Sequence, residues 1–214
     1  MILYYTSIDT PLPARVFQEL CSVIPEIWRR KIFAFARWKD AHLSLFGKLL
    51  LKQGLEDIWD DQFELNDIQY TEFGKPYLAG CSDFSISHSE RTVVCLFSER
   101  TDERIGIDIE FIKPIDLDDY ASIFSKEEFQ GIKKSDRFLE DFYSCWTKKE
   151  AIVKAVGCGL DFPLSEINTM SKVDVQVRDS FFYIREMKCF DAYALSLASS
   201  HHFNDAIDLR RISF

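Results

Sequence analysis

The sequence predicts an α+β fold made of two similar halves, and three observations support this prediction. The 214-residue chain is long enough for one large domain or two small ones. Hydrophobic residues make up 47% of it, which is enough for a substantial core. An order of strand, long helices and antiparallel strands occurs twice along the chain. We therefore expect an internal duplication of one α+β unit, with halves at residues 1–104 and 105–214.

The first half begins with an apolar strand near residues 2–8. Pro13 and Pro25 each introduce a helix, because proline is tolerated in the first helical turn. From Trp38 the apolar residues recur every three to four positions, which predicts a helix that ends near Gly54. Two further apolar segments predict strands at 84–87 and 92–97.

The second half begins with a strand whose two faces differ. Residues 105–110 alternate between isoleucine on one face and Gly106, Asp108 and Glu110 on the other. The two carboxylates are roughly 7 Å apart at Cα, so both can reach one point, and they repel unless a cation or water screens them. Helices are then expected from about 116 to 156, followed by strands at 173–177, 181–184 and 193–197.

A later helix supplies a third carboxylate beside two ammonium groups. Glu150 and Lys154 are spaced i, i+4 on one helix face, with Lys149 beside them. Mg²⁺ prefers carboxylate oxygens and leaves its other positions to water and substrate phosphates. Together with Asp108 and Glu110, this helix indicates a magnesium site next to a phosphate site. A solvated acidic strand and an ordinary Glu–Lys helix pair are the alternative interpretation of the same residues.

Composition and charge argue against several classes of protein. The net charge of −9 is unlike that of a general nucleic-acid binder, which usually carries a basic surface. No apolar run approaches the roughly 20 residues needed to span a bilayer, and the N-terminus lacks the charged region of a signal peptide. The six cysteines are scattered, with no CxxC pair, which favours reduced thiols. We expect a cytoplasmic protein that binds neither nucleic acid nor membrane.

Five short motifs, in this order and spacing, resemble the 4′-phosphopantetheinyl transferases of the single-chain, surfactin-synthetase-activating type. They are Phe-Gly-Lys-Pro at 73–76, Phe-Ser-Ile-Ser-His-Ser at 84–89, Ile-Gly-Ile-Asp-Ile-Glu at 105–110, Phe-Ser-Lys-Glu-Glu at 124–128, and Trp-Thr-Lys-Lys-Glu-Ala-Ile-Val-Lys at 146–154, followed by Gly157. The resemblance runs from the first strand to past residue 195. It implies a pseudo-dimer of two α+β halves with the active site in the cleft between them.

The resemblance also implies an activity. Such an enzyme uses Mg²⁺ to move 4′-phosphopantetheine from coenzyme A to a serine of an apo acyl or peptidyl carrier protein, releasing adenosine 3′,5′-bisphosphate. A single chain would supply both walls of the cleft, so we expect a monomer. The sequence does not decide whether the carrier protein belongs to non-ribosomal peptide, polyketide or fatty-acid synthesis. The single-chain type of the family tends toward secondary metabolism such as antibiotic biosynthesis. The thiol end of coenzyme A should project from the cleft, so acyl groups should be tolerated.

The resemblance assigns roles to individual residues on the magnesium and pyrophosphate side. Asp108, Glu110 and Glu150 correspond to magnesium ligands, and Glu150 also resembles a proposed base toward the carrier serine. Full coordination to Mg²⁺ would weaken that basicity, so the second role is left open. Lys149 and Lys154 correspond to pyrophosphate contacts, since lysine serves as a point-charge phosphate binder. We take Asp108, Glu150 and Lys154 as the catalytic residues.

Coenzyme A also carries a 3′-phosphate, which needs its own cationic pocket. The resemblance implies that eight positions line or shape the coenzyme A site. They are Lys31, Ser44, Gly74, Lys75, Pro76, Ser87, His88 and Lys154, the last of which also corresponds to a pyrophosphate contact. Trp28 stands where the family has a further lysine, and Arg29 or Arg30 are candidates to replace it. His42 also fits a family position, with a satisfied helix histidine as the equal alternative.

Two other functions remain open. A magnesium-dependent phosphohydrolase could use the same carboxylates on a nucleotide, but it would need neither the Ser-Ile-Ser-His segment nor the Lys-Glu-Ala-Ile-Val-Lys helix. A non-catalytic module that binds coenzyme A or a carrier protein would be favoured by degraded carboxylates. All three carboxylates are present.

Overall fold

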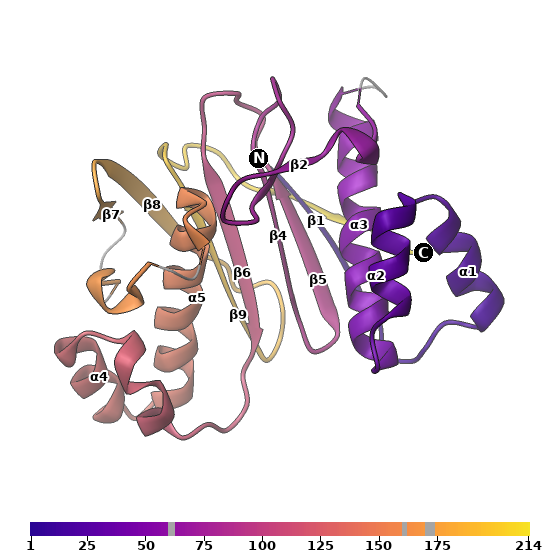
Figure 1. The fold of residues 1–214 in the computed structure, drawn as a ribbon. Coiled ribbons are helices and arrows are strands. Elements are labelled where there is room, and N and C mark those ends of the chain that lie inside the picture. Colours follow the sequence, from indigo (N-terminus) through magenta and orange to yellow (C-terminus); the bar gives the residue numbers. More distant parts are fainter. Residues whose placement is uncertain (60–62, 160–161, 170–173) are drawn as a thin grey trace.

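A computed structural model of the chain describes residues 1–59, 63–159, 162–169 and 174–214. Two four-stranded sheets lie in the centre, and helices cover their outer faces (Figure 1). The predicted α+β class and the arrangement as two similar halves are thereby confirmed, because each half contains a four-stranded sheet and one long helix. Within the described residues, no helix is long and apolar enough to cross a membrane.

The first half follows the predicted order of elements. Its elements are β1 (Ile2–Ser7), α1 (Ala14–Ser22), α2 (Glu26–Phe33), α3 (Trp38–Trp59), the 3-10 turn η1 (Leu65–Asp67), β2 (Gln69–Tyr70), β3 (Pro76–Tyr77), β4 (Phe84–Ser89) and β5 (Thr92–Phe97). Pro13 and Pro25 directly precede α1 and α2, as predicted. The long helix α3 packs against the sheet through a buried apolar core that includes Leu45, Leu50 and Phe97.

Helix α3 runs past Gly54, where the sequence predicted its end. Gly54 lies inside the helix and is buried. A Cβ at this position would stand 2.1 Å from the Phe97 ring of β5. The glycine therefore permits a close approach between helix and sheet, and the prediction of a helix end at Gly54 was wrong.

The second half repeats the plan of one sheet and one long helix. Its elements are β6 (Ile105–Phe111), the 3-10 turn η2 (Leu117–Ile123), α4 (Lys126–Lys133), α5 (Phe138–Val156), the 3-10 turn η4 (Leu164–Glu166), β7 (Asp174–Val177), β8 (Ser180–Glu186) and β9 (Tyr193–Ser199), with β10 (Asp208–Arg211) near the C-terminus. Ser125 and Glu128 form a capping box at the start of α4. Helix α5 ends at Gly157, whose φ of 75° is left-handed. The predicted strand at 173–177 matches β7, except that Val173 lies outside the described residues.

The last strand returns to the first half. The sheets have the orders β10-β1-β5-β4 and β6-β9-β8-β7, and β10 pairs in parallel with β1. No sequence pattern predicted β10, because its four residues, Asp-Leu-Arg-Arg, show no apolar alternation. The expected second half at 105–214 therefore needs a correction, since residues 208–211 complete the sheet of the first half.

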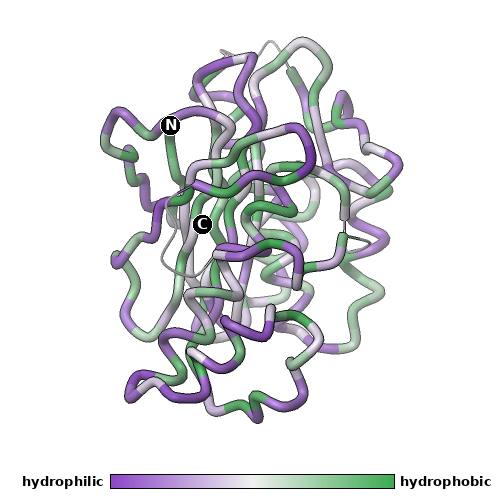
Figure 2. The backbone as a smooth tube through the Cα atoms, turned by 90° about the vertical axis from the view of Figure 1, so that its left-hand side faces the viewer, coloured by the Kyte–Doolittle hydropathy of each residue, from purple (hydrophilic) through white to green (hydrophobic). Residues whose placement is uncertain are grey.

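An apolar layer to which both halves contribute fills the space between the two sheets. It contains Leu3, Val94 and Leu96 from the first sheet and the isoleucines of β6 with Leu195 and Leu197 from the second. The hydrophobic stretches of the central strands are visible in Figure 2. On its other face, β6 meets α5 so closely that a Cβ on Gly106 would lie 1.9 Å from the Ala151 carbonyl oxygen. The predicted two-faced strand is confirmed: isoleucines face the other half, and Gly106 and Asp108 face α5.

Strands β4 and β6 lie side by side at the junction of the halves and are joined by side chains. Every second residue from 83 to 89 accepts a hydrogen bond from a backbone N–H of β6, with a constant offset of 22 positions. The pairs are Asp83 with Ile105 (2.9 Å), Ser85 with Ile107 (3.1 Å), Ser87 with Ile109 (3.3 Å) and Ser89 with Phe111 (3.0 Å). We call these four contacts the side-chain seam. It fixes the register of one half against the other.

Candidate functional site

A pocket of about 440 Å³ opens beside the side-chain seam. Helix α3, the 70–76 segment and β4 line it from the first half, and α5 lines it from the second. Seven of the predicted site residues lie in its wall: Ser44, Gly74, Lys75, Pro76, His88, Glu150 and Lys154. The two halves thus meet at a shared cavity that holds predicted residues from both.

Asp108 and Lys154 form an ion pair at the edge of this pocket. The Lys154 ammonium lies 2.6 Å from Asp108 Oδ1 and also donates to Ser87 Oγ at 2.9 Å. Ser87 donates to the same Asp108 oxygen at 2.8 Å and accepts from the Ile109 N–H. One contact group therefore joins β4, β6 and α5. The hydroxyl of Ser87 uses its donor and both acceptor positions here, so the structure does not offer it as a free contact for the 3′-phosphate.

The three predicted metal-binding carboxylates share one electrostatic environment. Burial raises the pKa of Glu110, and the neighbouring Asp108 charge raises it further. Burial also raises the pKa of Glu150, with added repulsion from Asp108 and Glu110. Ser89 and Lys154 partly offset the increase at Glu110. Because each carboxylate feels the charge of its neighbours, the cluster favours a proton or a cation.

The carboxylates suit a magnesium ion in chemistry, although they do not converge on one point. The described residues contain no group of three or more His, Cys, Asp or Glu side chains placed to hold a metal ion. Asp108 Oδ1 instead contacts Lys154, and Glu110 accepts from Ser89 at 2.7 Å. Asp108 Oδ2, however, is buried and accepts no hydrogen bond from the residues that the structure describes. A buried carboxylate oxygen left unsatisfied is costly, and a hard cation is a partner that would satisfy it.

Lys149 points away from the pocket, which corrects its prediction as a pyrophosphate contact. Its side chain has 0% exposure and its ammonium lies 2.8 Å from Glu128, which is equally buried. It also donates to the carbonyl oxygens of Leu164 and Ile167. Burial lowers the pKa of Lys149, and the Glu128 carboxylate opposes that shift. The pair anchors α4 and the 164–167 segment to α5.

The remaining predicted cations occupy different positions. Lys75 lines the pocket, but its ammonium pairs with Asp83 at 2.5 Å and so carries a compensated charge. Lys31 is exposed on α2 and is not part of the pocket wall. His88 is exposed in the wall, where desolvation by neighbouring atoms, and then the charges of Lys154 and Lys48, lower its pKa. Lys75, His88 and Lys154 are therefore the predicted basic groups in the pocket wall, and both lysines pair with a carboxylate.

Sequence reasoning missed one cation and two aromatic residues in the pocket wall. Lys48, Tyr70 and Phe73 all line the cavity. Lys48 stands one turn after Ser44 on α3, so the i, i+4 spacing from a predicted site residue is the signal that could have found it. The aromatic pair occurs in the segment around the Phe-Gly-Lys-Pro motif, and no periodic pattern marked it.

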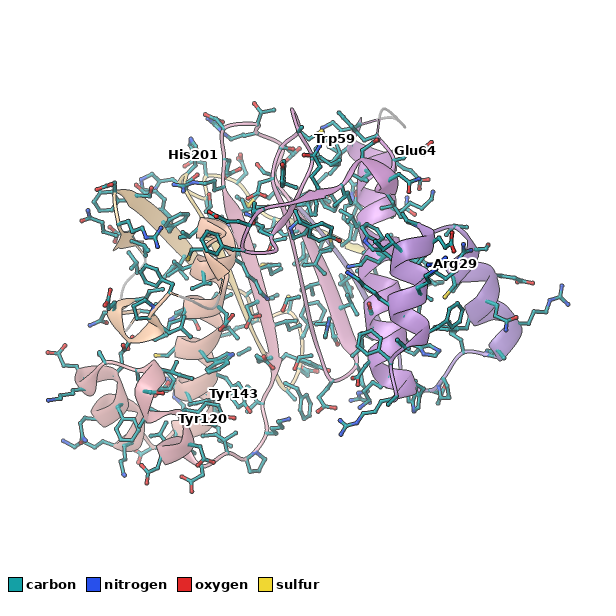
Figure 3. All side chains as sticks on the ribbon, in the orientation of Figure 1. Arg29, Trp59, Glu64, Tyr120, Tyr143 and His201 are labelled. Atoms are coloured by element: carbon teal, nitrogen blue, oxygen red, sulfur yellow. The ribbon has the colours of Figure 1, made fainter. Side chains whose placement is uncertain are left out.

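The candidates to replace a lysine at Trp28 do not reach the pocket. Arg30 pairs with Glu26 on the exposed side of α2. Arg29 acts on the Cys21 thiol of α1, and Figure 3 shows it on the side of α2 away from the strands. Trp28 itself is buried, and its ring lies beneath the Lys48 ammonium at 5.1 Å.

His42 is a satisfied helix histidine. It is 5% exposed, its Nδ1 contacts the Trp38 carbonyl oxygen at 2.7 Å, and its Nε2 accepts from the Leu12 N–H at 3.1 Å. Its ring stacks on Phe17. The structure therefore supports a structural role for His42 rather than a role in the site.

Two family models match consecutive parts of the chain. The model described as "4'-phosphopantetheinyl transferase, N-terminal" matches residues 10–100, and that described as "4'-phosphopantetheinyl transferase superfamily" matches residues 104–203. The junction between the two matches falls just before β6, the first strand of the second sheet.

Individual relatives match over most of the chain. The 4′-phosphopantetheinyl transferase Sfp of Bacillus subtilis (strain 168) is 32% identical over 213 residues, covering 94% of this chain and 93% of the relative. The 4′-phosphopantetheinyl transferase gsp of Aneurinibacillus migulanus is 28% identical over 204 residues, covering 92% and 85%. Among solved structures, the holo-[acyl-carrier-protein] synthase of Thermotoga maritima is 16% identical with a TM-score of 0.35, covering 45% of this chain and 61% of that one.

Proposed function

This chain belongs to the 4′-phosphopantetheinyl transferases, and on that premise we propose how its pocket performs the transfer. The enzyme moves the 4′-phosphopantetheine group of coenzyme A to a serine hydroxyl of an apo acyl or peptidyl carrier protein. The released product is adenosine 3′,5′-bisphosphate. The observation that carries the assignment of residues is the pocket beside the seam, where His88 of the first half faces Glu150 and Lys154 of the second.

Coenzyme A lies across this pocket with its two ends at different walls. The adenine and the 3′-phosphate lie against α3, β4 and the loop at Gly74 and Pro76, with Ser44 and His88 in contact. The pyrophosphate lies at the α5 wall, where the Lys154 ammonium neutralises part of its charge. The pantetheine arm points out of the pocket. This orientation is supported by the placement of Lys154 beside the carboxylates and of His88 on the β4 side.

Asp108, Glu110 and Glu150 are the residues that would hold Mg²⁺. When bound, the ion supplies charge neutralisation at the pyrophosphate and so favours attack by an oxygen nucleophile. The partnerless Asp108 Oδ2 and the mutual repulsion among these carboxylates support the assignment. The ion pair of Lys154 with Asp108 supports a phosphate contact beside these carboxylates.

The chemistry then requires one bond to form, one to break and one proton to move. The serine oxygen of the carrier attacks the β-phosphorus of coenzyme A, and the bond from that phosphorus to the bridging oxygen breaks. The bridging oxygen leaves with adenosine 3′,5′-bisphosphate. Glu150, at the pocket wall, accepts the serine proton directly or through water, and Lys154 stabilises charge that develops on the phosphates.

A single mass measurement tests this function. The protein is incubated with an apo carrier protein, coenzyme A and Mg²⁺, and the carrier is then weighed. Transfer adds the mass of one phosphopantetheine to the carrier and yields adenosine 3′,5′-bisphosphate. Hydrolysis of coenzyme A with an unmodified carrier would assign the protein to the phosphohydrolases, and an unchanged mixture would leave it a binding module.

We further propose that the enzyme acts as a cytoplasmic monomer on carriers of secondary metabolism. Both walls of the pocket come from one chain, which supports the monomer. Comparing apo carriers from peptide, polyketide and fatty-acid synthesis in the same assay would rank the substrates by kcat/KM.

A further inference from the structure

Lys48 is a cation in the pocket wall, and no carboxylate of the described residues forms an ion pair with it. It lies on α3, one turn after Ser44, and is half-buried. Within the part of the chain that the structure describes, the groups that act on its charge are the buried Cys95 thiol and the Lys31 ammonium. Burial is the main cause that lowers the pKa of Lys48, and Lys31 lowers it further. An ammonium that is desolvated and uncompensated favours an anion beside it.

Neighbouring lysines differ from Lys48 in this respect. Lys39 pairs with Glu90 at 3.0 Å, Lys75 pairs with Asp83, and Lys52, one turn further along α3, pairs with Glu56. Each of these ammonium groups has its charge compensated within the protein. Lys48 instead lies over an aromatic ring, 5.1 Å from the centre of the Trp28 ring.

Trp28 supports two residues of the pocket wall at once. Its ring lies under the Lys48 ammonium, a cation–π contact that orients the charge without neutralising it. Its indole also lowers the pKa of Tyr70, against the rise caused by burial, and Tyr70 lines the same pocket. Trp28 is 5% exposed and therefore a rigid support. The residue that stands in place of an expected lysine on α2 thus holds a lysine of α3 in the pocket.

The two lysines of the pocket that act on His88 come from different helices, Lys48 from α3 and Lys154 from α5. Lys154 contacts Asp108, whereas the charges of both Lys154 and Lys48 act on His88. Among the described residues, the groups whose charge acts on Lys48 include no carboxylate. His88 feels the charge of two pocket lysines, Lys154 on α5 beside Asp108 and Lys48 on α3. A ligand with two separated phosphate groups matches this arrangement.

We propose that Lys48, held by Trp28, contacts the 3′-phosphate of coenzyme A and selects for nucleotides that carry it. The inference rests on the proposed function, because it takes coenzyme A as the ligand. Trp28 is a positioning residue for that contact.

The decisive variant is Lys48→Met, which keeps the length of the side chain and removes its charge. Loss of a charge-assisted contact should raise the KM for coenzyme A by about ten- to a hundredfold. The KM for dephospho-coenzyme A, which lacks the 3′-phosphate, should change by less than about threefold, and kcat with either substrate should stay near wild type. Lys48→Arg should recover most of the affinity for coenzyme A. Lys52→Met is the matched control on the same helix and should leave both KM values unchanged.

Equal KM changes for the two substrates, or no change for coenzyme A, would overturn the assignment. A purely structural role would lower the melting temperature without changing the preference between the substrates. Direct binding separates this inference from the proposed activity. Wild type should bind adenosine 3′,5′-bisphosphate more tightly than adenosine 5′-monophosphate in calorimetry, and Lys48→Met should reduce that preference by about ten- to a hundredfold. This measurement needs no transfer, so an inactive carrier assay with an intact preference would contradict the function and leave the inference standing.

Discussion

The Lys154 ammonium lies 2.6 Å from Asp108 Oδ1, and this ion pair joins α5 to β6 at the edge of the pocket. Ser87 of β4 contacts both partners. Asp108 therefore presents one oxygen to the protein and leaves the other without a partner. Asp108, proposed for the metal, and Lys154, proposed for the phosphate, are in contact. A ligand that binds one of them therefore also changes the charge felt by the other.

Asp108→Asn should reduce transfer by at least about a hundredfold, because a neutral amide cannot supply the charge stabilisation, worth several kcal/mol, that the metal site needs. The shape of the side chain is kept, so the fold should survive. Carrier mass against time measures the rate at saturating Mg²⁺. Asp102→Asn, at an exposed carboxylate that contacts Arg100, is the control. A rate within tenfold of wild type would remove Asp108 from the metal site.

His88→Ala should weaken coenzyme A much more than dephospho-coenzyme A, because the imidazole is proposed to contact the 3′-phosphate. A charge-assisted hydrogen bond contributes about 1.5–3 kcal/mol, which corresponds to about a ten- to a hundredfold change in KM. Steady-state KM values for the two substrates measure the difference. His202→Ala, at an exposed histidine beside Tyr183, should change neither value. Equal losses with both substrates would assign His88 to the fold or to catalysis.

Lys149→Met should destabilise the protein by about 3–5 kcal/mol, because it leaves the buried Glu128 carboxylate without its counter-ion. Urea unfolding measures the free energy. The double variant Lys149→Met with Glu128→Gln should be more stable than the single one, since no buried charge remains unpaired. Lys133→Met, which breaks an exposed pair with Asp118, should cost no more than about 1 kcal/mol.

The same Lys149→Met variant also tests the corrected placement of this lysine. Transfer per folded molecule should stay within about threefold of wild type, because the ammonium does not face the pocket. A large rise in the KM for coenzyme A in fully folded protein would return Lys149 to the phosphate contacts.

The enzyme should be active as a monomer, because one chain supplies both walls of the pocket. Specific activity should stay constant from micromolar to low nanomolar protein, and sedimentation should report a mass near 25.0 kDa. Activity that falls on dilution in step with dissociation of a dimer would contradict an internal site.

The sequence predicted the features that depend on local periodicity. The two-faced strand at 105–110 and the i, i+4 relation of Glu150 and Lys154 are of this kind, and both place their side chains as expected. Lys149 is adjacent to Glu150, so it points about 100° away around the helix. Motif membership alone could not show that this direction leads into the core, because the packing of α4 against α5 decides it.

Features that depend on contacts between distant segments were not predictable in this way. Gly54 matched a helix end in the local pattern, but its role is set by the Phe97 ring of β5. The Lys48–Trp28 contact arises only where α2 packs against α3. Strand β10 forms because β1 offers an edge, and its own four residues carry no signal of it.

Because of the side-chain seam, hydrogen exchange along β6 should report whether the two halves separate. Along β6, the amides of Ile105, Ile107, Ile109 and Phe111 are protected by side-chain oxygens from the other half. The intervening amides face β9 within the same sheet. If the halves part while each sheet stays intact, hydrogen exchange accelerates at alternate residues of one strand. Alternating exchange along β6 would therefore distinguish opening of the cleft from unfolding of the domain, residue by residue and without any label.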